Sequence, residues 1–293
     1  MRLLITGRDG QLARSIAERA AGREATELIF AVRPKADLEI PGAVAEAIRS
    51  ARPDLVVNAA GFTDVDRAEH APDLALRINA DAAGEAAAAA ASVGCPIIQM
   101  STDYVFDGRA RTPYGETAAT GPLNIYGASK LAGEAQVRAA VEHHLILRTS
   151  WLFGPFGSNF VKTMIGLARE RDEIRVVDDQ CGSPTNTLVL ADAILVAVEG
   201  ALARPGLGRT LHIAGKGVCT WADVARQVMA SSAAAGGRSA KILGIPSSDY
   251  PTAARRPAYS ALDSSEFERT FDFTFPDWRE SVDAVVRRLV AGA

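Results

Sequence analysis

The stretch that decides the fold is Leu3-Leu4-Ile5-Thr6-Gly7-Arg8-Asp9-Gly10-Gln11-Leu12-Ala13, near the start of the chain. An apolar run ends in glycines with the spacing G-x-x-G-x-x-A, which predicts a buried strand that turns directly into a helix. Gly7 permits the tight turn, Gly10 lets the backbone approach a pyrophosphate, and small Ala13 lets the helix pack closely on the sheet. We therefore predict a dinucleotide phosphate site here, against the simpler alternative of an ordinary strand-to-helix turn.

Short apolar segments and helix-like segments alternate through the first half of the chain. The apolar segments lie at 3–5, 28–30, 55–57, 97–98 and 145–147, and the helix-like segments lie at 11–21, 42–51, 81–93 and 125–140. Apolar runs this short and this uniform suit strands buried on both faces of a parallel sheet. The alternation predicts an α/β fold in which residues 1–150 form a doubly wound, Rossmann-type dinucleotide-binding domain.

The alternation becomes less regular after Trp151, where glycine and proline punctuate the sequence. A proline-rich loop is expected at 246–257, and a last helix at 277–290. We predict that residues 151–293 mainly form a second, smaller α/β domain that binds the substrate. This domain can still return strands or helices to the first.

Composition and charge narrow the class of protein. The 293 residues have a formal net charge of −3 and 48% apolar side chains, which is typical of a globular protein and lacks the basic excess of a nucleic-acid binder. The longest weakly polar stretch, 82–98, is interrupted by Glu85, so we expect no membrane segment. Cys95, Cys181 and Cys219 are scattered and the histidines lack ligand-like spacing, which predicts a cytoplasmic protein with no metal site.

Tyr126 and Lys130 lie four residues apart at the start of the helix predicted at 125–140. That spacing places both side chains on one helical face. A neighbouring ammonium favours the phenolate and lowers the pKa of a tyrosine, so the pair predicts a proton donor that works near neutral pH. Taken alone, however, such a pair occurs on an amphipathic helix more often by chance than for catalysis.

The end of the second predicted strand indicates which nicotinamide cofactor is preferred. The run Ala31-Val32-Arg33-Pro34-Lys35 contains no acid to bind a ribose 2′-hydroxyl, whereas Arg33 and Lys35 can accept a 2′-phosphate. We therefore predict NADPH, with NADH as the alternative and solvated loop charges as the simpler interpretation. The predicted cofactor-binding residues are Gly7, Gly10, Gln11, Leu12, Arg33, Asp37, Leu38, Ala59, Ala60, Gly61, Thr63, Met100, Tyr126 and Lys130.

Ser101-Thr102-Asp103 follows the fourth predicted strand and places a hydroxyl at the carboxyl end of the sheet. Together with the Tyr-x-x-x-Lys pair and the glycine-rich turn, this hydroxyl resembles the extended short-chain dehydrogenase/reductase family. Further stretches resemble, in order and spacing, the dTDP-4-dehydrorhamnose reductases of that family. These stretches are 58–66, 101–108, 148–151, 159–160, 178–185, 250–252 and 256–257, so the resemblance covers nearly the whole chain.

This resemblance implies reduction of the C4 keto group of dTDP-4-dehydro-L-rhamnose to dTDP-L-rhamnose by NADPH or NADH. Tyr126 would donate the proton to the keto oxygen, and Lys130 would lower the tyrosine pKa and hold the nicotinamide ribose. Thr102 would hold the same carbonyl, so Thr102, Tyr126 and Lys130 are the implied catalytic residues. The substrate is thus expected to be a dTDP-sugar.

The implied substrate-binding residues are Thr102, Asp103, Tyr126, Trp151, Asn159 and Arg256. Arg256 is the candidate for the nucleotide diphosphate, because a planar guanidinium suits phosphate oxygens; a surface ion pair is its simpler alternative. Core packing is the simpler alternative for Trp151.

Some family members form dimers around a magnesium ion held by glutamates, but this chain has Ser15 at one of those positions. We therefore expect no structural magnesium, while a homodimer is still compatible with the resemblance.

Two other functions share this fold. A nucleotide-sugar epimerase or dehydratase would keep the Tyr-x-x-x-Lys pair, but dehydratases usually place an acidic pair after the threonine, and here only Asp103 follows Thr102. A non-catalytic regulatory subunit need not keep Thr102, Tyr126 and Lys130 together. All three are present, which favours a reductase.

Overall fold

Six strands rich in leucine, isoleucine and valine form the central sheet of the computed structural model, which describes residues 1–23, 25–204 and 206–292. The strands are β1 (Arg2–Thr6), β2 (Glu27–Ala31), β3 (Leu55–Asn58), β4 (Ile97–Thr102), β5 (His144–Thr149) and β10 (Arg209–His212). Their order is β10-β5-β4-β3-β1-β2, and every neighbouring pair is parallel. The doubly wound α/β prediction is therefore confirmed. The strand order reverses at β1, and such a reversal opens a crevice at the carboxyl ends of the strands.

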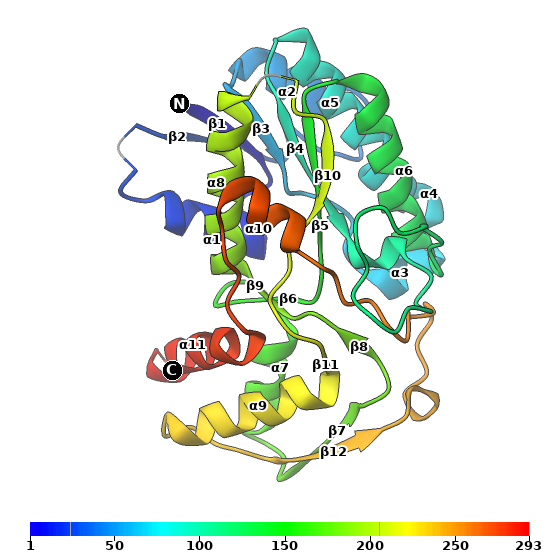
Figure 1. Cartoon of the computed structure of the whole chain (residues 1–293), viewed down its shortest axis with the longest axis vertical. Helices are drawn as coiled ribbons and strands as arrows, with labels where there is room; N and C mark the ends of the chain where they lie inside the picture. The colour runs from blue at the N-terminus through cyan, green and yellow to red at the C-terminus, as the bar shows by residue number, and fades with distance from the viewer. Residues whose placement is uncertain (24, 205, 293) are drawn as a thin grey trace.

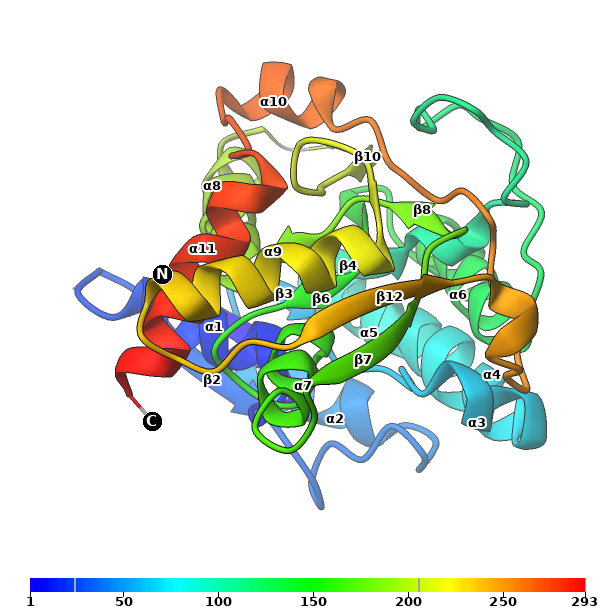
Figure 2. The same cartoon turned by 90° about the horizontal axis from the view of Figure 1, so that it is seen from below.

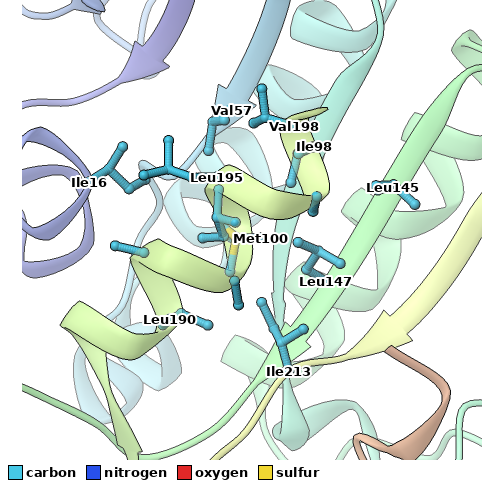
Figure 3. Close-up of a cluster of buried hydrophobic side chains, with 14 of the residues drawn as sticks. Ile16, Val57, Ile98, Met100, Leu145, Leu147, Leu190, Leu195, Val198 and Ile213 are labelled. Carbon is cyan, nitrogen blue, oxygen red and sulfur yellow. The ribbon is translucent and has the colours of Figure 1, made fainter. Parts of the chain in front are cut away.

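Helices cover both faces of this sheet (Figure 1). On one face lie α1 (Gln11–Ala20) and α8 (Thr187–Ala203), and on the other lie α2 (Ala43–Ala51), α5 (Ala82–Ser92) and α6 (Ile125–Ala140). Figure 3 shows the first core, where Leu195 and Val198 of α8 pack with Val57 and Ile98 of the strands. In the second core most of the alanines of α5 are buried, and their small side chains let α2 and α6 pack close to it.

Three short helical segments connect β3 to α5: α3 (Val65–His70), α4 (Pro72–Leu76) and the π-helical turn η1 (Arg77–Asp81). The sequence predicted a helix only from residue 81. Pro72 interrupts the helical pattern, because proline fits the first turn of a helix but not its interior. The 3-10 turn η2 (Asp103–Val105) follows β4 directly.

The smaller lobe lies below the sheet in Figure 1, and Figure 2 shows it from the near side. Strands β7 (Glu173–Val177) and β12 (Lys241–Ile245) pair in parallel, and helices α7 (Phe160–Leu167), α9 (Trp221–Ala234) and α11 (Trp278–Ala291) pack around a core of their own. Two strand pairs and a 3-10 turn complete this part of the chain. They are β6 (Leu152–Phe153) with β9 (Thr185–Asn186), β8 (Cys181–Gly182) with β11 (Cys219–Thr220), and η3 (Ser247–Asp249).

Residues 151–293 contribute to both lobes. Helix α8, strand β10 and helix α10 (Ser265–Phe271) return to the sheet of the larger lobe, where β10 pairs with β5 and α10 contacts both α8 and β10. Helix α8 is apolar on nearly every side because α1, α10 and the sheet surround it. Of the helices in the described part of the chain, none has the length and apolar character that crossing a membrane requires.

Candidate active site

A cleft of about 850 Å³ opens where the carboxyl ends of β1, β3 and β4 meet residues of the smaller lobe. Most of the predicted cofactor and catalytic residues line it: Gly7, Gly10, Gln11, Leu12, Arg33, Leu38, Ala59, Ala60, Gly61, Thr63, Met100, Thr102, Tyr126 and Lys130. The predicted substrate residues Asp103, Trp151 and Asn159 line it as well. Asp37 and Arg256 are not among the residues that form its walls.

The glycine-rich turn forms one end of the cleft. Gly7 has a φ of +78°, a left-handed conformation that glycine adopts without strain, and its N–H donates to the Ala31 carbonyl at 2.8 Å. Gly10 begins α1 in an extended conformation, and a Cβ placed there would meet nothing within 4 Å. Because Gly10 has no side chain to cap the helix, the first amides of α1 are left to bind an anion. The turn therefore fits a pyrophosphate.

A row of buried polar side chains crosses the sheet directly beneath this turn. The Thr6 hydroxyl donates to Asn58 Oδ1 at 2.7 Å, and Asn58 Nδ2 donates to Gln99 Oε1 at 2.7 Å. The same Thr6 oxygen accepts the N–H of Ala60 at 2.9 Å. This row fixes the backbone at 59–61, where the sequence predicted cofactor contacts. The sequence analysis did not predict this row, although Thr6 and Asn58 are polar residues at the ends of apolar strands and Gln99 is a polar residue inside one.

The loop after β2 contains two carboxylates, Asp37 and Glu39, just after the basic residues at 33 and 35 on which the NADPH prediction rests. Arg33 Nε lies 3.1 Å from Asp37 Oδ1, and Arg33 Nη2 lies 2.5 Å from Glu39 Oε1. The Arg33 side chain is 64% exposed. The Arg33 guanidinium, which was predicted to bind a 2′-phosphate, is therefore shared with two carboxylates. Asp37 binds Arg33 instead of lining the cleft.

Helix α6 carries the tyrosine and the lysine. Asn124 caps it by accepting the N–H of Gly127 at 2.8 Å, and Gly127 packs so tightly that a Cβ there would lie 2.1 Å from the Tyr104 carbonyl oxygen. Only glycine lets the start of α6 approach the turn after β4 this closely. The approach brings the Tyr126 ring to 5.9 Å from that of Tyr104, edge to face, at the carboxyl end of β4.

The ammonium of Lys130 is buried and donates to the Met100 carbonyl at 2.6 Å. Burial lowers the pKa of Lys130 to about 8, against the opposing charge of Glu134. Burial also raises the pKa of Tyr126 to about 12, although a hydrogen bond with Thr102 opposes the rise. The expected lowering of the tyrosine pKa by Lys130 is therefore not what this structure shows, because the ammonium points to a β4 carbonyl and desolvation dominates.

Thr102 and Asp103 lie beside Tyr126 at the end of β4. The Thr102 hydroxyl donates to Asp103 Oδ1 at 3.1 Å, and both side chains are buried. Burial raises the pKa of Asp103 to about 7, against hydrogen bonds from Ser260 and Thr102. Within the described part of the chain, Asp103 Oδ2 and the hydroxyl of Thr149 are buried polar atoms that lack a hydrogen-bond partner. Since Asp103 and Thr149 both line the cleft, these atoms fit a polar ligand.

Two tryptophans form the opposite wall. Trp151 stacks on Trp221, with ring centroids 3.6 Å apart and planes 8° apart, and Phe160 packs against Trp221 at 4.8 Å. Trp151 has a φ of +46°, a strained conformation for a bulky residue that costs on the order of 1–3 kcal/mol. The predicted substrate residue Trp151 thus reaches the cleft, whereas Trp221 was not predicted. Its only local signal is the Thr-Trp-x-Asp capping pattern that starts α9.

Asn159 joins the smaller lobe to the glycine-rich turn. Its side chain caps α7 by accepting the N–H of Lys162, and its Nδ2 donates to Gly154 O at 2.9 Å and to Gln11 Oε1 at 3.0 Å. These contacts give Asn159 a structural role next to its predicted role in substrate binding.

A second hollow, of about 1420 Å³, adjoins the cleft at Phe160 and Trp221. Arg171, Arg175, Arg255 and Arg256 are among the residues that line it. The Arg256 guanidinium pairs with Asp66 through both nitrogens, at 3.0 and 2.6 Å. The hydrogen bonds from Arg256 hold the pKa of Asp66 below its usual range, in spite of partial burial. The predicted phosphate ligand Arg256 is therefore placed in this second hollow, where it forms an ion pair.

Comparison with known proteins shows the family. The sequence matches, over residues 1–291, the family described as RmlD substrate binding domain. The chain belongs to this family. It is 42% identical to a dTDP-4-dehydrorhamnose reductase of Sinorhizobium fredii, over 99% of this chain and 97% of the relative. The resemblance inferred from the ordered motifs is confirmed.

Solved structures of such reductases superpose on the whole RmlD-family chain. A dTDP-4-dehydrorhamnose reductase from Clostridium acetobutylicum has a TM-score of 0.92 at 38% identity, with 99% of both chains covered. One from Bacillus anthracis, in complex with NADP, has a TM-score of 0.90 at 34% identity, with 97% of this chain and 98% of that chain covered.

Ser15 of this RmlD-family chain is a buried packing residue. Its hydroxyl donates to Thr187 Oγ1 at 2.8 Å and so joins α1 to α8. Among the residues that the structure describes, no three His, Cys, Asp or Glu side chains gather in a way that could hold a metal ion. The absence of a structural magnesium stays a prediction.

Proposed function

We propose that this chain reduces the C4 keto group of dTDP-4-dehydro-L-rhamnose to dTDP-L-rhamnose with NADPH, as a cytoplasmic enzyme of dTDP-rhamnose biosynthesis. The single observation that carries this proposal is the cleft itself. A turn suited to a pyrophosphate forms one end, and Thr102, Tyr126 and Lys130 converge at the carboxyl end of β4. The full-length similarity to dTDP-4-dehydrorhamnose reductases supports the identity of the substrate.

The cleft fits a nicotinamide dinucleotide. Gly10 leaves open space at the start of α1, and Ala59 and Ala60 keep the side chains small where the strand order reverses. The Bacillus anthracis relative was solved with NADP. When bound, the reduced nicotinamide supplies the hydride that attacks C4 of the sugar. Lys130, already held by the Met100 carbonyl, is placed to hold the nicotinamide ribose.

Tyr126 is the proposed proton donor. With a pKa raised to about 12, its hydroxyl stays protonated at neutral pH and can donate a hydrogen bond to the keto oxygen. The Thr102 hydroxyl, next to it, can hold the same oxygen. The negative charge that develops on that oxygen makes it more basic than the Tyr126 phenolate, so the phenol proton transfers to it as the hydride arrives. The donor is thus activated as the reaction proceeds rather than in the resting site.

The second hollow is suited to the nucleotide end of the substrate. Its arginines can bind a diphosphate, and Trp221, which stacks on Trp151, lines both this hollow and the cleft that contains Tyr126. We assign Arg256 to the diphosphate on this ground. Asp66 holds the guanidinium in place, so the phosphate must either share Arg256 with Asp66 or displace the carboxylate.

The test is a turnover assay with purified protein. dTDP-4-dehydro-L-rhamnose and NADPH should be consumed in equal amounts, and mass spectrometry should identify dTDP-L-rhamnose. An epimerase would interconvert sugars without net loss of NADPH, and a regulatory subunit would consume no cofactor with any 4-keto sugar. Either of those results would reject the reductase assignment.

A further inference from the structure

A buried carboxylate lies behind the catalytic residues, on the side of α6 that faces the sheet. Glu134 is 0% exposed and lies one helical turn after Lys130. Its two oxygens accept hydrogen bonds from Arg148 Nε at 2.8 Å and Nη2 at 2.7 Å, from Ser101 Oγ at 2.6 Å, and from Arg138 Nη2 at 2.7 Å. Arg148 is buried as well, so the pair has lost nearly all its solvent.

Burying a carboxylate and a guanidinium together costs several kcal/mol of solvation, which their attraction often only offsets. Replacing such a pair by apolar residues of similar size is often neutral or stabilising, so a buried ion pair is weak evidence for a role in stability. The position of this pair indicates another role. Ser101, which Glu134 binds, lies between Met100, whose carbonyl holds Lys130, and Thr102, whose hydroxyl lies beside Tyr126. Arg148 is the residue paired with Ser101 on the neighbouring strand β5.

We propose that Glu134 is a positioning residue of the active site, which fixes the end of β4 through Ser101 and Arg148 and places its carboxylate one helical turn from Lys130. Glu134 acts in two ways. Through hydrogen bonds it sets the backbone that presents the Met100 carbonyl and the Thr102 hydroxyl. Through its charge it opposes the loss of the Lys130 proton that burial favours, which is the direction of its effect on the pKa of Lys130. This inference rests on the proposed role of Lys130.

Several other charged or titratable groups lie on α6 and on the elements next to it. They are Tyr126 and Arg138 on α6, Asp103 and Tyr104 after β4, and Arg148 on β5. Arg77 of η1, which packs against α6, pairs with Asp81 and Glu85. Glu134 is the carboxylate whose charge acts on Lys130, and its oxygens are shared with Arg138 and Arg148. When Lys130 loses its proton at higher pH, the attraction between Glu134 and Lys130 is lost.

The test compares unfolding free energies of the ligand-free protein across pH. Lys130 has a lower pKa folded, about 8, than unfolded, so its burial penalty is full below pH 8 and is relieved as the pH rises toward the unfolded value. In Glu134→Gln the charge that stabilises protonated Lys130 is lost. The stability deficit of this variant relative to wild type should therefore shrink as the pH rises through 8. Glu142→Gln, which removes an exposed carboxylate just after α6, should show a difference that does not vary with pH.

A deficit of Glu134→Gln that stays constant across this range would overturn the proposal, because Glu134 would then act only on the arginines.

The glutamine amide faces a guanidinium and can prevent folding, so Ser101→Ala supplies a second test. This variant loses only the hydroxyl that links Glu134 to β4. Its kcat should fall about tenfold, as expected for small displacements of reacting groups, with NADPH affinity retained. Ser231→Ala, which also removes a hydroxyl of a buried serine that donates to a carboxylate, that of Asp283, but lies on α9 of the smaller lobe, is the control. Wild-type kcat in Ser101→Ala would refute the positioning role.

Discussion

The two walls of the cleft are built in different ways. The wall formed by the glycine-rich turn, the end of β4 and the start of α6, here called the cofactor wall, consists of buried or capped groups on regular elements. The opposite wall, formed by Trp151, Phe160 and Trp221, is assembled from loops and helix ends of the smaller lobe; together with the Arg256 loop of the adjoining second hollow it is here called the substrate wall. Groups on the cofactor wall have strongly shifted pKa values, whereas Arg256 on the substrate wall forms a partly exposed ion pair with Asp66.

We infer from this difference that the reaction takes place at the cofactor wall and that the substrate is selected at the substrate wall. Desolvated groups change their proton affinity and hold fixed geometry, which suits transition-state stabilisation. Partly exposed arginines and aromatic rings bind a large substrate without changing the reaction. Changes in the cofactor wall should therefore lower kcat or cofactor affinity, and changes in the substrate wall should raise KM. Each of the following predictions tests that division.

Tyr126→Phe should produce the largest effect. It removes the proposed proton donor but keeps the ring against Tyr104, so kcat should fall on the order of 10²–10⁴ with little change in NADPH affinity. Steady-state assays and a calorimetric titration with NADPH measure the two quantities. Tyr259→Phe, which loses a phenol outside both hollows, is the matched control. A Tyr126→Phe enzyme within about threefold of wild type would remove the tyrosine from the acid role.

Gly10→Val should weaken NADPH binding without unfolding the protein. Gly10 has an extended conformation and open space at its Cβ, so valine fits the fold but blocks the approach of a pyrophosphate to the first amides of α1. Loss of about 3 kcal/mol of phosphate contacts corresponds to a Kd raised roughly a hundredfold. Gly115→Val, at another glycine with open space, is the control. Equal Kd values for wild type and Gly10→Val would contradict the phosphate site.

Arg256→Gln should raise the KM for the dTDP-sugar by about tenfold and leave kcat nearly unchanged, since a charge-assisted hydrogen bond to phosphate is weakened by sharing with Asp66. The control is Arg109→Gln, because the Arg109 side chain is 86% exposed and outside both hollows. If kcat falls instead and KM stays constant, the substrate wall takes part in the chemistry, and the division between the walls is wrong.

Cofactor preference should be the smallest effect. Arg33 is 64% exposed and paired with Asp37 and Glu39, so the ratio of kcat/KM for NADPH over NADH should exceed one by only a few-fold. Arg33→Ala should bring the ratio close to one. Replacing Asp37 and Glu39 by their amides frees Arg33 and should raise the ratio. If these substitutions leave the ratio unchanged, the loop does not contact the 2′-phosphate.

The sequence predicted the cofactor wall well because its signals are local. Strands β1 to β5 coincide with the predicted apolar runs, and the turn after β1 contains the spacing that a pyrophosphate site requires. Tyr126 and Lys130 share a helical face simply because they are one turn apart. In contrast, Trp221 and the polar row from Thr6 to Gln99 were missed, since neither has a periodic or motif-like signature.

The parallel α/β sheet, the glycine-rich turn and the Tyr-Lys pair could therefore be predicted from the sequence, because each depends on residues close in sequence. The environment of these groups, in contrast, depends on the tertiary structure. It placed Asp66 beside Arg256, 190 residues away, stacked Trp151 on Trp221, and buried Glu134 against Arg148. The pKa values follow from that burial rather than from spacing, which is why Tyr126 has a raised pKa where the local pattern predicted a lowered one.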